Sequence, residues 1–192
     1  MPMTPDEALA VVAAHRGGRV VFTTMSSAGI WPKLSDTPLD FTYIPSAMGQ
    51  GPSLGLGLAL AQPARGVVVL CGDGSLLMNL GCLVTIAQHP ANVWLLLIDN
   101  GLYEVTGGQP VAGAGRTDFA GLARAAGIAR VYEISDKAQM AQLATEIFAG
   151  DGPVFVCLKV EGRLGQKTPA ALRPMGEQIR RLREALGNVE KE

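Results

Sequence analysis

The sequence is short of charge, and the charge that it has is balanced. Only 17% of its 192 residues are charged, and 16 Lys and Arg stand against 17 Asp and Glu, with no block of one sign. This balance gives no electrostatic footprint for nucleic acid or for an acidic membrane surface. Because 48% of the residues are hydrophobic, the composition excludes a disordered chain and suggests that something other than water covers part of the surface.

Cysteine is scarce and lacks the spacing of a metal or redox site. Cys71, Cys82 and Cys157 are widely separated, and none belongs to the C-x-x-C pair typical of zinc, iron–sulfur or dithiol sites. The first residues lack the pattern of an export signal, and no apolar run reaches the roughly 18 residues of a membrane span. We therefore expect a cytoplasmic protein in which Cys71 and Cys82 are buried as small apolar side chains.

The length of 192 residues suits one domain, and no repeat or shift in composition divides residues 1–192. Helical periodicity alternates with short β-rich runs, which predicts an α/β fold: a doubly wound, mostly parallel six-stranded sheet with helices on both faces. Strands are expected at 19–23, 41–44, 66–71, 93–98, 131–134 and 154–160. Helices are expected at 4–15, 28–34, 48–61, 75–88, 118–126, 136–149 and about 174–186. A Gly-rich loop at 99–117 is long enough to favour a functional role.

One turn combines a buried strand with two glycines and an acid. The strand at 66–71 runs into Gly72-Asp73-Gly74-Ser75, so Asp73 should lie where open α/β sheets bind ligands. Gly72 would permit a tight turn, Gly74 would let backbone N–H groups approach an anion, and Ser75 would cap the next helix. Asp73 would repel a phosphate unless a cation lay between them. The turn therefore indicates a metal together with a diphosphate.

The chain then returns to the same edge of the sheet. A helix over 75–88 runs roughly 21 Å away from Asp73, and the strand at 93–98 brings the chain back by roughly 20 Å. Asn100 should therefore lie beside Asp73. A carboxylate, an amide oxygen and a backbone carbonyl, completed by phosphate oxygens and water, form the octahedral oxygen set that suits Mg²⁺.

The stretch GDGSLLMNLGCLVTIAQHPANVWLLLIDNGLY resembles the thiamine diphosphate (ThDP) signature, in which GDG is followed by about 25 residues and an Asn. The segments PSAMGQGPSLGLGLALA, GDGSLLMNLG and LIDNGLYEVTGGQP are similar to sulfopyruvate and phosphonopyruvate decarboxylases. The likeness covers nearly the whole chain. It implies the ThDP-binding fold, in the form of its diphosphate-binding (PP) domain.

The resemblance also implies roles for individual residues. Asp73, Asn100 and the backbone carbonyl of Leu102 would bind Mg²⁺. Met48 matches a bulky apolar residue that bends the cofactor so that its two rings approach each other, and the backbone of Ser46 and Met48 would bind the aminopyrimidine. The implied cofactor-binding residues are Thr24, Ser26, Ser46, Met48, Gly72, Gly74, Ser75, Leu102 and Tyr103.

A second α/β domain does not fit into 192 residues, although in this family a glutamate on a pyrimidine-binding domain contacts the cofactor. The resemblance therefore implies an α-type subunit that carries this domain and its Glu. The chain itself would be the β-type subunit of an α/β hetero-oligomer, with a small 2-oxoacid as substrate. The expected reaction is non-oxidative decarboxylation by a carboxy-lyase, and carboligation is an alternative outcome.

Several alternatives remain open at this point. Glu104 could face the substrate or be a solvated loop carboxylate, because some related decarboxylases have a glutamate two positions later, where this chain has Thr106. Residues 106–116 could form a lid, and Arg116 or Lys33 could bind an anionic substrate. The β subunit of a 2-oxoacid:ferredoxin oxidoreductase, a dehydrogenase component and a non-catalytic nucleotide-binding or scaffold module are the rival functions. Dinucleotide binding is disfavoured, because Pro52 and Leu54 break the G-x-G-x-x-G pattern.

Overall fold

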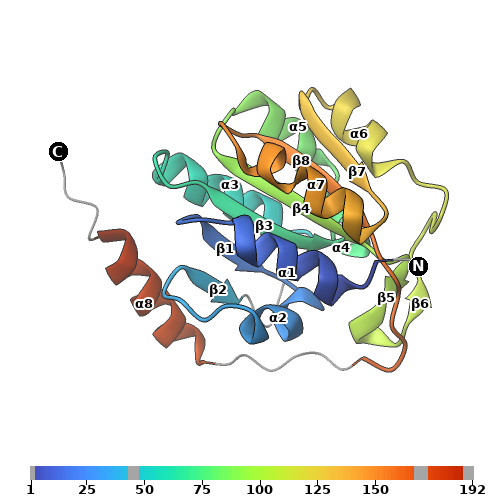
Figure 1. Ribbon diagram of the computed structural model, residues 1–192, viewed down its shortest axis with the longest axis horizontal. Helices are drawn as coiled ribbons and strands as arrows, with labels where there is room; N and C mark the ends of the chain where they lie inside the picture. Colours follow the sequence, from blue (N-terminus) through green and yellow to red (C-terminus); the bar gives the residue numbers. More distant parts are fainter. Residues whose placement is uncertain (1–2, 43–47, 167–172, 188–192) are drawn as a thin grey trace.

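A six-stranded sheet forms the centre of the protein in the computed structural model, which describes residues 3–42, 48–166 and 173–187 (Figure 1). Its strands follow the order β2-β1-β3-β4-β8-β7, and every neighbouring pair is parallel. The strands are β1 (Val20–Thr23), β2 (Asp40–Thr42), β3 (Val67–Gly72), β4 (Val93–Asp99), β7 (Arg130–Ile134) and β8 (Val154–Lys159). The predicted doubly wound parallel sheet is confirmed.

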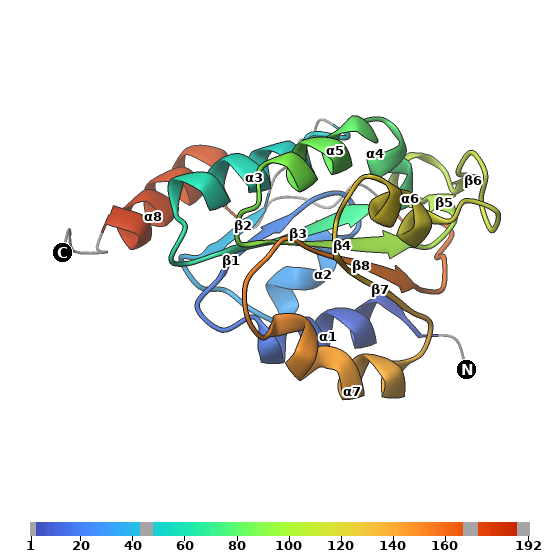
Figure 2. The same ribbon diagram turned by 90° about the horizontal axis from the view of Figure 1, so that it is seen from above.

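Helices cover both faces of this sheet, as Figure 2 shows. One face carries α1 (Pro5–His15), α2 (Ser27–Ile30), the 3-10 turn η1 (Trp31–Lys33) and α7 (Lys137–Phe148). The other carries α3 (Gly51–Ala61), α4 (Asp73–Leu77), α5 (Gly81–Gln88), α6 (Phe119–Ala125) and α8 (Met175–Gly187). None of the helices in the described part of the chain combines the length with the apolar character needed to span a bilayer.

Alternating residues of the strands build two core layers. In β3, Val67, Val69 and Cys71 pack against one set of helices, while Val68 and Leu70 pack against the other. Such doubly covered strands are apolar on both sides, which is why their sequence is a continuous apolar run. Burial raises the pKa of the Cys71 thiol to about 12 and that of Cys82 to about 11, so both are inert core residues as predicted.

The predicted helix over 75–88 is wrong, because the structure has two shorter helices there. Helix α4 begins at Asp73, and α5 begins only at Gly81. Between them, the Asn79 side chain donates a hydrogen bond to the Gly49 carbonyl at 3.0 Å. Asn and Gly are weak helix formers, and a side chain committed to another segment favours a break.

Two other boundaries differ from the sequence prediction. Helix α3 begins at Gly51, whereas Met48 and Gly49 form a turn before it. The predicted structureless loop at 99–117 contains the 3-10 turn η2 (Glu104–Thr106) and an antiparallel hairpin of β5 (Leu102–Tyr103) with β6 (Gln109–Pro110). The hairpin register pairs Leu102 with Pro110, and the two strands form a small sheet of their own beside the six-stranded one.

The order of the strands fixes where a ligand site lies. Strand β2 lies on one side of β1, whereas β3 and β4 lie on the other. The connections that leave β1 and β3 therefore diverge, and a crevice opens between them at the carboxyl ends of the strands. The segments that meet at this crevice are 24–27, after β1, and 72–75, after β3.

Candidate active site

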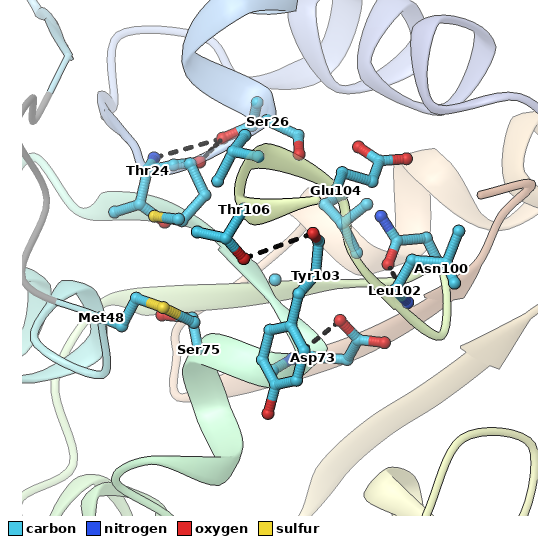
Figure 3. A pocket seen from close by; sticks show the side chains of 16 residues that line it. Thr24, Ser26, Met48, Asp73, Ser75, Asn100, Leu102, Tyr103, Glu104 and Thr106 are labelled. Atoms are coloured by element: carbon cyan, nitrogen blue, oxygen red, sulfur yellow. Dashed lines mark hydrogen bonds between the residues drawn. The ribbon is translucent and has the colours of Figure 1, made fainter. Parts of the chain in front are cut away.

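A pocket occupies the crevice between these two connections (Figure 3). Figure 3 shows Asp73, Asn100 and Leu102 on one side of the pocket, with Met48 pointing in from the opposite side. The structure thus brings together nearly all of the predicted site residues. The lining residues are Thr24, Met25, Ser26, Ser27, Met48, Gly72, Asp73, Gly74, Ser75, Ile98, Asn100, Leu102, Tyr103, Glu104, Val105 and Thr106.

Asp73 is one of two buried acidic residues that line the pocket, with only 3% of its surface exposed. Its Oδ1 accepts a hydrogen bond from the Gly74 N–H at 2.7 Å, and its Oδ2 accepts one from the Gly101 N–H at 2.7 Å. Burial raises the pKa of Asp73 to about 7, although these two N–H donors lower it. The carboxylate is thus fixed in direction but short of compensating positive charge, which a divalent cation would supply.

Asn100 and Leu102 follow β4 on the same side of the pocket. The Asn100 Oδ1 accepts a hydrogen bond from the Leu102 N–H at 2.9 Å, so the side chain folds back over its own loop. The described residues contain no group of three His, Cys, Asp or Glu side chains that could hold a metal. Asp73, Asn100 and Leu102 bring oxygen donors to one side of the pocket, and oxygen is the donor type that Mg²⁺ prefers.

The structure corrects the role predicted for Gly72 and adds a packing role for Gly74, whose approach to an anion stays a prediction. Gly72 has an extended conformation with φ of −80°, so no tight turn requires a glycine there. A Cβ added at Gly72 would meet no atom within 4 Å, and Gly72 lines the pocket, so its missing side chain leaves space for a ligand. A Cβ added at Gly74 would overlap the ring of Tyr103. Gly74 therefore lets Tyr103 pack across the start of α4.

Ser75 does not cap a helix, which corrects the sequence prediction. It lies inside α4, and its Oγ accepts a hydrogen bond from the Gly49 N–H at 2.9 Å. This bond joins the segment after β3 to the turn that contains Met48. Met48 is half-buried and lines the pocket as predicted, whereas Ser46 lies outside the described residues.

The segment after β1 forms the third wall of the pocket. Thr24 donates from Oγ1 to the Leu70 carbonyl at 2.9 Å, which attaches this segment to β3. Met25 has a left-handed conformation with φ of 52°, an unfavourable geometry for a residue with a side chain and one that is frequent at ligand sites. Ser26 follows at the start of α2 and lines the pocket beside Ser27.

Glu104 is buried, with 2% of its surface exposed, so the alternative of a solvated loop carboxylate is wrong. Its Oε1 accepts a hydrogen bond from the Arg163 N–H at 2.7 Å, while the buried Oε2 has no hydrogen-bond partner in the described residues. The Arg163 guanidinium in turn donates to Asp6 at 2.8 Å. The role of Arg163 was missed by sequence reasoning, because it lies 59 residues from Glu104 and follows no motif.

The two predicted anion-binding candidates lie away from the pocket. Arg116 is exposed and lines a separate groove with Asp118 and Glu133. Lys33 is exposed at the end of η1. Among the described lining residues the pocket holds no Lys, Arg or His.

Comparison with known proteins identifies the class to which this fold and pocket belong. Residues 23–158 match the family described as "Thiamine pyrophosphate enzyme, C-terminal TPP binding domain", and the chain belongs to this family. Its fold is shared with a thiamine diphosphate-dependent 4-hydroxybenzoylformate decarboxylase from Rhodococcus jostii RHA1. That structure superposes with a TM-score of 0.69 and 22% identity over 83% of this chain and 33% of the other.

The curated relatives that the chain matches include two kinds of decarboxylase. The chain is 43% identical to the β subunit of sulfopyruvate decarboxylase from Methanothermobacter thermautotrophicus, over 67% of this chain and 65% of that subunit. It is 38% identical to phosphonopyruvate decarboxylase from Streptomyces viridochromogenes, over 76% of this chain and 36% of that protein. The predicted likeness to these carboxy-lyases is confirmed. The chain spans little more than a third of the phosphonopyruvate relative.

Proposed function

We propose that this chain is the β-type, diphosphate-binding subunit of a heteromeric Mg²⁺- and ThDP-dependent 2-oxoacid decarboxylase. The observation that carries the proposal is the fixed Asp73 carboxylate, held by the N–H groups of Gly74 and Gly101 at the crevice between β1 and β3. The bond to Gly101 brings the Gly72-Asp73-Gly74 turn next to the loop that contains Asn100. Both then lie at the edge where parallel α/β sheets bind ligands. The decarboxylase relatives supply the reaction class.

Each wall of the pocket has a task in this proposal. Asp73, Asn100 and the Leu102 carbonyl hold Mg²⁺, while Gly72 leaves room for the diphosphate that completes the ion's ligands. The hydroxyl groups of Thr24, Ser26 and Ser75 add polar contacts to the diphosphate. Met48 supports the cofactor from the opposite side of the pocket. When bound, ThDP supplies the electron sink for the bond that breaks as carbon dioxide leaves.

Glu104 and Tyr103 complete the side of the pocket nearest to the substrate. Tyr103 is held by its contact with Gly74, and its carbonyl accepts a hydrogen bond from the Gly108 N–H at 2.9 Å. The Oε2 of Glu104 is buried and has no hydrogen-bond partner in the described residues, so a substrate could reach it only after a small movement of this loop. A buried carboxylate without a full set of partners is unfavourable unless a ligand satisfies it.

The α-type partner would bring the pyrimidine-binding domain and its glutamate. Three of the sulfopyruvate decarboxylase relatives are named as β subunits, which supports an assembly of two kinds of chain. The decisive experiment measures carbon dioxide release from a panel of 2-oxoacids, with the purified chain alone and with the partner added. We expect little turnover from the chain alone even with ThDP and Mg²⁺. Substantial decarboxylation by the isolated chain would contradict the two-chain proposal.

A further inference from the structure

A lysine outside the pocket is paired with an acidic residue that lies beside Asp73. Asp99 is the last residue of β4, and its register partner is Lys159, the last residue of β8. The Lys159 Nζ lies 2.5 Å from the Asp99 Oδ2. The Asp99 side chain is only 10% exposed, so this ammonium group offsets the cost of burying its charge.

The Asp99 carboxylate also acts on Asp73. In the parallel register, both residues directly follow the last residue pair of β3 and β4, so they are neighbours at the carboxyl ends of adjacent strands. The pKa of Asp73 is raised first by burial and further by the charge of Asp99. Two neighbouring carboxylates are suitable ligands for one divalent cation. Asp99 is therefore a second acidic group at the metal side of the pocket, and the GDG and Asn motif does not include it.

Lys159 and Asp73 lie on different sides of the loop that carries Asn100. Asn100 lines the pocket together with Asp73, and it also lines a second groove together with Asp99, Gly101 and Lys159. Asp99 stands between the two sides. The ion pair with Lys159 thus draws the Asp99 carboxylate toward the groove and away from the pocket.

The charges around Lys159 leave Asp99 as its principal partner. The Glu133 Oε2 is 4.0 Å from the Lys159 Nζ, and Glu133 is half exposed, so this second ion pair is weak. Arg116 and Arg124 line a groove with Lys159. Of the cations in the described part of the chain, however, Lys159 alone lies within ion-pair distance of Asp99.

We propose that Lys159 is a positioning residue of the Mg²⁺ site, because it keeps the Asp99 carboxylate from joining Asp73 as a second anionic ligand. The inference rests on the proposed function and adds a residue to the metal site. Mg²⁺ takes six ligands, and a diphosphate carries negative charges of its own. A second free carboxylate would fill a position that the diphosphate needs and would repel the cofactor.

Binding of Mn²⁺ to the full chain without cofactor tests this proposal. Mn²⁺ prefers the same oxygen donors as Mg²⁺, and electron paramagnetic resonance measures its free concentration. Lys159→Met frees the Asp99 carboxylate, so we expect Mn²⁺ to bind at least about tenfold more tightly than in the wild type. Addition of Asp73→Asn should abolish this gain, which would place the ion at this site.

Asp99→Asn should have the opposite effect. It leaves the Lys159 ammonium unpaired beside the site, so we expect weaker Mn²⁺ binding than in the wild type. The double variant Lys159→Met/Asp99→Asn removes both charges and should return to the wild-type affinity. If the ion pair had only a structural role, both single variants would bind Mn²⁺ more weakly and the double variant would not recover.

Two lysine substitutions serve as controls. Lys159→Arg keeps the ion pair and should bind Mn²⁺ like the wild type. Lys137→Met removes the same charge from an exposed ion pair with Glu7, on the face covered by α1 and α7 (Figure 2), and should change nothing. A Mn²⁺ affinity of Lys159→Met that is equal to or below that of the wild type overturns the proposal. If the thermal midpoint shows that this variant does not fold, an undiminished Mn²⁺ affinity of Asp99→Asn overturns it.

The affinity for ThDP at saturating Mg²⁺ should change in the opposite direction from the affinity for the cation. In Lys159→Met with its partner present, we expect calorimetry to show ThDP binding at least about tenfold more weakly than in the wild type, because the freed carboxylate competes with the diphosphate. ThDP binding as tight as in the wild type would contradict the proposed role of Lys159.

The failure of this inference and that of the proposed function give different results. If Lys159→Met binds Mn²⁺ and ThDP like the wild type while the assembled wild type releases carbon dioxide, the role of Lys159 is wrong and the function stands. If Lys159→Met gains Mn²⁺ affinity and loses ThDP affinity while the assembled wild type releases no carbon dioxide from any 2-oxoacid, the role stands and the function is wrong.

Discussion

The backbone N–H of Gly101 donates a hydrogen bond to the Oδ2 of Asp73 at 2.7 Å. The two residues are 28 positions apart, and this bond joins the turn after β3 to the loop after β4. The same carboxylate holds the Gly74 N–H with its other oxygen. Asp73 therefore organises the backbone of both loops before any ligand arrives, and the direction of its carboxylate is set by the fold.

Replacement of Asp73 by Ala or Asn should abolish Mg²⁺-dependent binding of ThDP. The variants lose the only carboxylate among the three proposed metal donors, so we expect at least about a 100-fold loss of affinity in isothermal titration calorimetry. Unchanged affinity would remove the site assignment.

Folding is a separate question for these variants. In the Asn variant one of the two backbone N–H groups loses its acceptor, while removal of a buried charge offsets this loss at pH 8. The thermal midpoint of the ligand-free variant is measured to show that lost binding does not come from unfolding. Asp151→Ala, at an exposed position outside the pocket, provides the matched control and should bind normally.

Substitutions at the two glycines of the motif should have different effects, one on the packing of the fold and the other on the space for the ligand. Gly74→Ala places a methyl group in the Tyr103 ring and should reduce the free energy of unfolding by about 1–3 kcal/mol. Gly72→Ala meets no atom within 4 Å and should leave stability within about 0.5 kcal/mol of the wild type. Its methyl group would instead enter the pocket and weaken ThDP binding. Urea denaturation and calorimetry measure the two effects, and equal stability of the two variants would contradict this division of roles.

The sequence predicted the parts of the fold that local pattern controls. The strands β3 and β4 are continuous apolar runs, which the sequence shows directly. The segment 75–88 and the strand β4 have nearly equal lengths, and this match predicted that Asn100 lies beside Asp73. Features that depend on distant contacts were missed. The break after α4 involves Gly49, the need for Gly74 comes from Tyr103, and the burial of Glu104 comes from the segment around Arg163. None of these contacts leaves a periodic signal in the sequence.

Helix α8 should loosen in acid. Asp36 receives hydrogen bonds from both terminal nitrogens of Arg173 at 2.6 Å, just before α8, and these bonds hold the pKa of the Asp36 carboxyl below its usual 3.8. A lowered folded-state pKa means that the stabilisation is present above pH 3.8 and is lost as the pH falls through the lowered value. The protection factors of α8 amides, which correct for the intrinsic pH dependence of exchange, should therefore fall as the pH drops below 3.8. In Asp36→Asn these protection factors should be the same at neutral and acidic pH, and a protection factor that still falls in acid in that variant would show that other groups control the helix.

Glu104 should select against substrates with a second negative charge. The described lining of the pocket has no cationic side chain, and the unpartnered Oε2 of Glu104 would repel a sulfonate or phosphonate nearby. Glu104→Gln removes this charge but keeps an oxygen that can accept the Arg163 N–H. In the assembled enzyme we expect the KM for sulfopyruvate to fall about 5- to 10-fold relative to that for 2-oxobutanoate, since one charge at this range is worth about 1 kcal/mol or more. Glu104→Ala removes the acceptor as well as the charge, so in this variant the Arg163 amide should also exchange its hydrogen faster. A parallel change in both KM values in the Gln variant would show that Glu104 holds the loop and does not discriminate between substrates.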